Sequence, residues 1–123
     1  MRAIVVDDSK AMRTILKRLL VECGYDHVDE AENGLIGLDV LRSGARPGLM
    51  LVDWNMPEMN GLEFVTAVRA IPLFNNVIIM MITTETAIER IEQALAAGAD
   101  EYLMKPFNKE VLLEKLELVK AAS

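Results

Sequence analysis

The chain alternates between short strand-like runs and longer segments in which apolar residues recur every three or four positions. A short run bounded by turn signals is typical of a strand, and the longer spacing is typical of a helix with one buried face. The most apolar run, Val77–Ile82, predicts a strand buried on both faces. In chain order, the predicted strands are Arg2–Val6, His27–Ala31, Leu49–Val52, Val77–Ile82 and Asp100–Met104.

A segment with helical spacing follows each predicted strand. After the first strand, Ser9 is placed to cap a helix and Gly24 to end it. The apolar stripe predicted to be buried on this helix consists of Met12, Ile15, Leu16, Leu19 and Leu20. The other helices are predicted from Gly34 to about Arg42, from Gly61 to near Pro72, from about Ile88 to Gly98, and after the capping residue Asn108. Because strands and helices alternate without a repeat or a linker, we predict an α/β fold with a doubly wound, three-layer arrangement around a five-stranded parallel sheet.

Length and composition narrow the class of protein. With 123 residues, 52% of them hydrophobic, the chain is long enough for one domain, residues 1–123, with a full core. No apolar run approaches the roughly 18 residues of a membrane span, and the N-terminal residues lack the layout of a signal peptide. The net charge of −6 argues against nucleic acid as the main partner, and the single cysteine, Cys23, favours a reducing compartment. We therefore expect a cytoplasmic protein that binds neither membrane nor nucleic acid.

Residues whose side chains could take part in catalysis or ligand binding follow four of the five predicted strands. Asp7 and Asp8 follow the first, Asp53 the third, Thr83 the fourth and Lys105 the fifth. The carboxyl ends of parallel strands share one edge of the sheet, which is where ligands bind in open α/β folds. We therefore expect three carboxylates, a hydroxyl and an ammonium group to converge there, although they are far apart in the sequence.

Three carboxylates in one pocket repel one another and require a cation unless some are protonated. Oxygen ligands in a small site favour Mg²⁺ over Ca²⁺. Beside Mg²⁺ and Lys105, Asp53 is placed to accept a phosphoryl group as an acyl phosphate, with Thr83 donating a hydrogen bond to it. Taken singly, each of these residues is more often a helix cap or a solvated charge. Their shared position at strand ends favours function.

With these residues, the sequence resembles the receiver domains of bacterial two-component response regulators over its whole length. The motifs that carry the resemblance are Asp7-Asp8, Asp53 with Asn55-Met56-Pro57 and Gly61, Thr83, and Lys105-Pro106-Phe107. The resemblance implies a flavodoxin-like fold with strand order 2-1-3-4-5 and five helices. The stretch from Asp53 to Pro57 looks most like that of the CheY-like, single-domain regulators of chemotaxis.

The resemblance also implies a role for each acidic residue. Asp53 would accept the phosphoryl group from a phosphohistidine. Asp8, Asp53 and the backbone carbonyl of Asn55 would hold Mg²⁺, with Asp7 acting largely through water. These assignments come from the family and not from the spacing of the residues.

Further implied roles concern the signal. Lys105 would contact the phosphoryl oxygens, and its peptide bond to Pro106 is expected to be cis. Thr83 would move to bond the phosphoryl group, and Tyr102 would then swing inward. The surface formed by the last two helices and the strand between them would change and dock an output partner.

The implied donor is a sensor histidine kinase of the CheA type, and the implied target is a downstream protein, with the flagellar motor switch as one candidate. Such a regulator is expected to be a monomer, with no enzymatic activity beyond its own phosphorylation and dephosphorylation. One alternative is a receiver cut from a longer response regulator with a different output.

Two other classes of protein are alternatives, and the sequence disfavours both. A phosphohydrolase of the haloacid-dehalogenase type would carry a second aspartate two residues after its nucleophile, where this chain has Asn55. A flavodoxin-like nucleotide binder would need a phosphate cradle after the first strand, where Asp7 and Asp8 would repel a phosphate.

Overall fold

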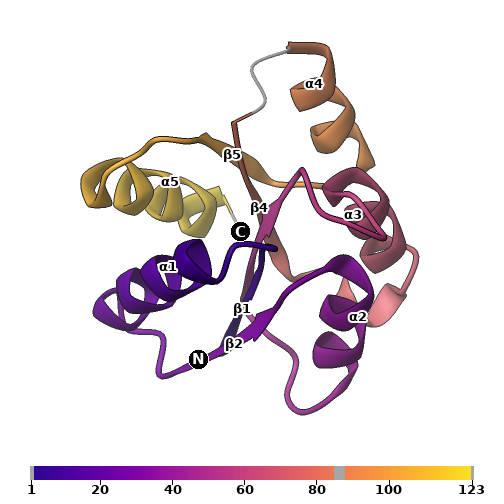
Figure 1. The fold of residues 1–123 in the computed structure, drawn as a ribbon, viewed down its shortest axis with the longest axis horizontal. Helices are drawn as coiled ribbons and strands as arrows, with labels where there is room; N and C mark the ends of the chain where they lie inside the picture. The colour runs from indigo at the N-terminus through magenta and orange to yellow at the C-terminus, as the bar shows by residue number, and fades with distance from the viewer. Residues whose placement is uncertain (1, 85–87, 123) are drawn as a thin grey trace.

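The computed structural model describes residues 2–84 and 88–122. At its centre is a sheet with strand order β2-β1-β3-β4-β5, in which every neighbouring pair is parallel (Figure 1). The strands are β1 (Arg2–Val6), β2 (His27–Ala31), β3 (Leu49–Asp53), β4 (Ile78–Thr83) and β5 (Glu101–Met104). The strand order implied by the family resemblance is confirmed.

Helices cover both faces of this sheet (Figure 1). They are α1 (Lys10–Glu22), α2 (Gly34–Arg42), α3 (Gly61–Arg69), α4 (Ile88–Ala97) and α5 (Lys109–Ala122), with a short 3₁₀ helix, η1 (Pro72–Phe74), before β4. Helices α1 and α5 pack on one face, and α2, α3 and α4 pack on the other. The predicted three-layer, doubly wound α/β fold is therefore confirmed, although the hydrophobic pattern did not predict η1.

Successive residues of the central strands face two separate cores. Ile4 and Val6 belong to the core under α2 and α3, whereas Ala3 and Val5 belong to the core under α1 and α5. All four side chains are fully buried. This two-sided burial explains why the central strands appear in the sequence as uninterrupted apolar runs. Within the described residues, the structure contains no helix of the length and apolar character that a membrane crossing requires.

Strand ends differ from the prediction by one residue. The fourth strand is Ile78–Thr83 and not Val77–Ile82, because Thr83 still pairs with Met104 of β5. Asp53 is likewise the last residue of β3, and β5 begins one residue later than expected. Asp53 and Thr83 therefore belong to hydrogen-bonded strands, which restricts their backbone more than a loop would.

Polar caps set the starts of the helices next to the site. The Ser9 hydroxyl accepts a hydrogen bond from the backbone N–H of Met12 at 3.2 Å, and Asn108 caps α5 in the same manner, as predicted. Asn60 and Glu63 form a reciprocal capping box at the start of α3. These caps fix the points at which the loops after β1, β3 and β5 give way to helices.

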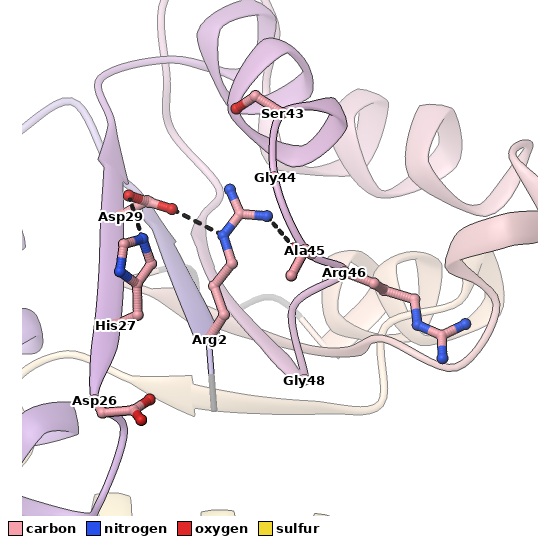
Figure 2. Close-up of a pocket in the computed structure, with 9 residues that line it drawn as sticks. All are labelled: Arg2, Asp26, His27, Asp29, Ser43, Gly44, Ala45, Arg46 and Gly48. Carbon is pink, nitrogen blue, oxygen red and sulfur yellow. Dashed lines mark hydrogen bonds and ion pairs between the residues drawn. The ribbon is translucent and has the colours of Figure 1, made fainter.

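Arg2 ties several elements together at the amino end of β1. Its Nε lies 2.8 Å from Asp29 Oδ2, and its guanidinium also donates to the backbone carbonyls of Val40 and Ala45. His27 Nε2 lies 3.3 Å from the other oxygen of Asp29 (Figure 2). The pocket drawn in Figure 2 lies at the amino ends of β1 and β2, so it lies at the opposite end of the sheet from the predicted site.

Arg69, like Arg2, joins several elements at the amino end of the sheet, and we call its set of hydrogen bonds the Arg69 clamp. Its Nε donates to the carbonyl of Gly98 at 2.9 Å, and its terminal nitrogens donate to the carbonyls of Phe74 at 2.8 Å and Val77 at 2.7 Å. One of these nitrogens also lies 3.0 Å from the carboxylate of Asp100. One largely buried side chain thereby joins α3, η1, the start of β4 and the segment before β5.

Replacing Arg69 with methionine is expected to lower the free energy of unfolding by about 2–4 kcal/mol, because several buried carbonyls and one carboxylate lose their donor. Urea denaturation at neutral pH measures this change. The matched control is Arg42→Met, which alters an exposed arginine in the last turn of α2 and should change stability by less than about 0.5 kcal/mol. Equal losses in both variants would contradict the clamp.

Candidate functional site

Three aspartates meet at the carboxyl end of the sheet. Asp7 extends β1 by one residue, since its N–H donates to the carbonyl of Ala31 at 3.0 Å, and Asp53 ends the neighbouring strand β3. One carboxylate oxygen from each of Asp7, Asp8 and Asp53 lies within 4.8 Å of the others. Asp7 and Asp53 are buried, at 1% and 7% exposure, whereas Asp8 is exposed. The cluster is therefore open to solvent on the side of Asp8.

Lys105 supplies a positive charge to this cluster from the segment that follows β5. Its Nζ lies 3.1 Å from Asp7 Oδ2 and 3.5 Å from Asp53 Oδ1. Its backbone N–H donates to the carbonyl of Thr83 at 2.8 Å, which holds the segment against the end of β4. The peptide bond between Lys105 and Pro106 is cis, as the resemblance implied. The predicted convergence of Lys105 with the acidic residues is thus present in the fold.

One ammonium group does not offset the charge of three carboxylates. Burial, together with the neighbouring charges of Asp7 and Asp8, raises the pKa of Asp53 to about 6, against the opposing effect of Lys105. The carboxylate stays largely ionised at neutral pH, but its charge is costly there. The site therefore has an affinity for additional positive charge.

The donor set fits Mg²⁺. The cluster offers carboxylate oxygens, which are the ligands that a hard divalent cation prefers, and the exposed side at Asp8 leaves room for water ligands. Both oxygens of Asp7 already have partners, the N–H of Ser9 at 2.8 Å and Lys105 Nζ at 3.1 Å. Asp7 is therefore placed to contact a cation through water, while Asp8 and Asp53 are the more direct candidates.

The loop after β3 closes tightly against the strand it leaves. The N–H of Gly61 donates to the carbonyl of Trp54 at 2.8 Å, and a Cβ atom at Gly61 would lie 2.6 Å from the carbonyl oxygen of Asp53. Only glycine allows this close approach. Asn55, whose backbone carbonyl was predicted to be a ligand, lies in this loop two residues beyond Asp53 with its side chain exposed. The loop thus leaves the sheet at Asp53, and its last residue, Gly61, packs against the backbone of Asp53 and Trp54.

The two predicted switch residues lie on adjacent strands. Thr83, at 2% exposure, is the last residue of β4, and Tyr102 lies on β5, opposite Met81 in the strand register. The Tyr102 ring is partly buried against the core under α2, α3 and α4, and Lys115 Nζ of α5 lies 4.8 Å from its centroid. Thr83 therefore lies at the site, and Tyr102 lies between the site and α5.

Arg13 touches the cluster as well, although the sequence interpretation did not single it out. Its Nη1 donates to the carbonyl oxygen of Asp7 at 2.6 Å, and its Nε lies 3.2 Å from Glu30 Oε1. Nothing in the hydrophobic pattern distinguishes Arg13 from the other basic residues of α1. Only the packing of α1 beside β2 brings the guanidinium to the end of β1.

Comparisons with known proteins agree with this geometry. A family model described as the response regulator receiver domain matches residues 3–117. Chemotaxis protein CheY1 of Helicobacter pylori strain J99 is 47% identical over 119 residues, which cover 97% of this chain and 96% of that protein. A CheY homolog of Campylobacter jejuni subsp. jejuni serotype O:23/36 is 46% identical over 117 residues, covering 95% and 90% of the two chains. The solved structure of the chemotaxis response regulator CheY4 of Vibrio cholerae superposes with a TM-score of 0.88 at 39% identity, covering 96% of this chain and 97% of that one. The chain therefore belongs to the response regulator receiver domain family.

Proposed function

We propose that this chain, residues 1–123, is one receiver unit that works as a phosphorelay switch, with Asp53 as the Mg²⁺-dependent phosphoryl acceptor. The observation that carries the proposal is the position of Asp53. It is a buried carboxylate, it lies within 4.8 Å of two others, and its Oδ1 is 3.5 Å from a lysine ammonium. A carboxylate held beside other acidic groups and a lysine ammonium is suited to act as the nucleophile in phosphoryl transfer.

The reaction at Asp53 is an in-line displacement at phosphorus. A carboxylate oxygen of Asp53 forms the new P–O bond while the P–N bond to the histidine of a sensor kinase breaks, and that imidazole keeps the electron pair and takes a proton. Asp8, Asp53 and the carbonyl of Asn55 would hold Mg²⁺, with Asp7 acting through water, and the ion would neutralise the phosphoryl oxygens. Lys105 contributes a second positive charge from a fixed position, which favours the charged transition state without reorganisation.

The output would come from the α4–β5–α5 surface. The hydroxyl of Thr83 would bond the phosphoryl group, and Tyr102 on the next strand would then move, which changes the surface that a partner contacts. Because several relatives are named chemotaxis proteins, we place this chain in chemotaxis. The phosphodonor would be a CheA-like kinase and the target a motor-switch protein of the flagellum, both engaged by a monomeric, cytoplasmic regulator. Receiver domains are generally not classical enzymes, and this one is proposed only to gain and lose its own phosphoryl group.

Incubation with acetyl phosphate and Mg²⁺ is expected to add one phosphoryl group to the wild type, because acetate can leave phosphorus in place of imidazole. Intact-mass measurement detects the adduct. Asp53→Asn should form none, and chelation of Mg²⁺ should prevent it in the wild type. The control Asp39→Asn, which removes an exposed carboxylate of α2, should behave as the wild type.

An adduct on Asp53→Asn at the wild-type rate would refute Asp53 as the acceptor. Rapid phosphate release without an adduct would point to fast turnover, and a stable complex with beryllofluoride would then still support the proposed acceptor site. The proposed function would be refuted if the wild type formed no adduct, released no phosphate and bound no beryllofluoride.

Asp8→Ala is expected to weaken Mg²⁺ binding by about tenfold or more, because the exposed member of the cluster is the most accessible ligand. The fluorescence of Trp54, the single tryptophan and the neighbour of Asp53, reports the titration. Asp39→Ala serves as the control for loss of one negative charge. Unchanged affinity in Asp8→Ala would mean that Asp8 serves only as a local cap.

Asp53→Asn is expected to stabilise the metal-free fold by about 1–2 kcal/mol at pH 7.5, less than the full pKa shift would give because solvent screens the charge. The folded pKa of about 6 lies above the ordinary value of 3.8, so the wild type loses stability as pH rises through this window. The gain in the variant should therefore shrink as pH falls from 6 towards 4. Urea denaturation in the presence of a chelator, at pH 7.5 and at pH 4, measures the difference in unfolding free energy between variant and wild type, with Asp39→Asn as control. A gain that does not depend on pH would contradict the electrostatic cause.

A further inference from the structure

The end of β1 lacks a strand partner for one of its carbonyl groups. The N–H of Asp7 still pairs with the carbonyl of Ala31, but β2 ends at Ala31 and the chain then turns into α2. The carbonyl oxygen of Asp7 accepts a hydrogen bond from Arg13 Nη1 instead, at 2.6 Å. The guanidinium therefore takes the place of a donor that a longer β2 would have supplied.

This hydrogen bond acts on the peptide unit between the two aspartates. The carbonyl of Asp7 and the N–H of Asp8 belong to one planar group, so a donor that fixes the oxygen also fixes the direction in which the chain enters Asp8. The other side of the turn is fixed by the N–H of Ser9, which donates to Asp7 Oδ1 at 2.8 Å. Asp8 itself is exposed, so packing does not hold its backbone in place.

Arg13 is in turn held by its neighbours. Its side chain is 13% exposed, its Nε lies 3.2 Å from Glu30 Oε1, and the other oxygen of Glu30 lies 3.9 Å from Lys17 Nζ. A planar guanidinium can bridge a carbonyl and a carboxylate with two nitrogens in fixed relative positions. An ammonium group offers all of its donors from one nitrogen, so it cannot reproduce two contacts made by separate nitrogens. The arrangement is therefore specific to arginine.

We infer that Arg13 is a positioning residue for the metal site: by holding the Asp7–Asp8 peptide, it orders Asp7 and Asp8 as ligands for a divalent cation. The inference rests on the proposed function, and adds to it a residue that touches neither the cation nor the phosphoryl group. Groups that orient ligands from outside a metal site are known to change metal affinity about 10- to 100-fold.

An electrostatic role and a positioning role of Arg13 predict opposite changes in Mg²⁺ affinity when the residue is removed. A guanidinium near the cluster repels a second cation, so a purely electrostatic role means that removal of Arg13 tightens Mg²⁺ binding. A positioning role means that its removal weakens binding, because Asp8 must then be ordered at the moment the cation arrives. The sign of the change therefore separates the two roles.

The test is a Mg²⁺ titration of the full chain, followed by Trp54 fluorescence and repeated by calorimetry. Arg13→Met is expected to weaken the affinity about tenfold, and Arg13→Lys nearly as much, although the lysine keeps the charge. The control is Arg18→Met, which removes the same charge from an exposed position on the same helix and should stay within about twofold of the wild type. Unchanged or tighter binding in Arg13→Met would overturn the inference.

Glu30→Met provides a variant that leaves the bond between Arg13 and Asp7 in place. It should weaken Mg²⁺ affinity less than Arg13→Met, by about threefold, and the double variant should be no weaker than Arg13→Met alone. Additive losses would mean that Glu30 does not act through Arg13. This variant also tests the inference if Arg13→Met does not fold.

Phosphorylation by acetyl phosphate supplies a second readout. The Mg²⁺ concentration for half-maximal adduct formation should rise about tenfold in Arg13→Met, while the rate at saturating Mg²⁺ returns to near the wild-type value. A general loss of structure would lower the saturated rate and the urea midpoint without a shift in the half-maximal Mg²⁺ concentration. If the wild type binds Mg²⁺ but shows no adduct, no phosphate release and no beryllofluoride complex, the proposed function fails, while the titration still decides the role of Arg13.

Discussion

The mutual repulsion of Asp7, Asp8 and Asp53 is the constraint on which the rest of the site depends. It follows from the pairing of β1 with β3, which places the ends of two buried strands side by side. Lys105 offsets only part of the charge, and burial together with the remaining repulsion from Asp7 and Asp8 raises the pKa of Asp53. A fold that holds like charges so close together gains from any ligand that brings positive charge, which is the physical basis of the cation binding in the proposed function.

Buried charge is handled differently at the two ends of the sheet. At the amino ends, the guanidinium groups of Arg2 and Arg69 are surrounded by backbone carbonyls and by one carboxylate each, so their donors are satisfied within the fold. At the carboxyl ends, acidic groups outnumber the basic group that faces them. The first arrangement stabilises the fold, and the second leaves an electrostatic imbalance that binding can relieve.

The strand register connects this imbalance to a distant surface. Thr83 pairs with Met104, and the carbonyl of Thr83 accepts the backbone N–H of Lys105, so β4 and β5 are joined at the site itself. Tyr102 lies two residues back from that junction on β5, under the ammonium of Lys115 from α5. A rearrangement at Thr83 thus has a short, hydrogen-bonded route to the surface formed by β5 and α5.

The hydrophobic pattern by itself determined the five strands, the five helices and their alternation, because a buried strand and a one-sided helix leave different apolar spacings. The same pattern placed Asp7, Asp8, Asp53, Thr83 and Lys105 at one edge, since parallel strands end together. Strand order came from the family resemblance, and the exact ends of β3 and β4 depended on pairing between strands. The position of Arg13 at the site was decided by tertiary structure alone. Its contact with Asp7 exists only because α1 packs beside β2, and no local spacing along the chain encodes a hydrogen bond between a helix side chain and the carbonyl of a neighbouring strand end.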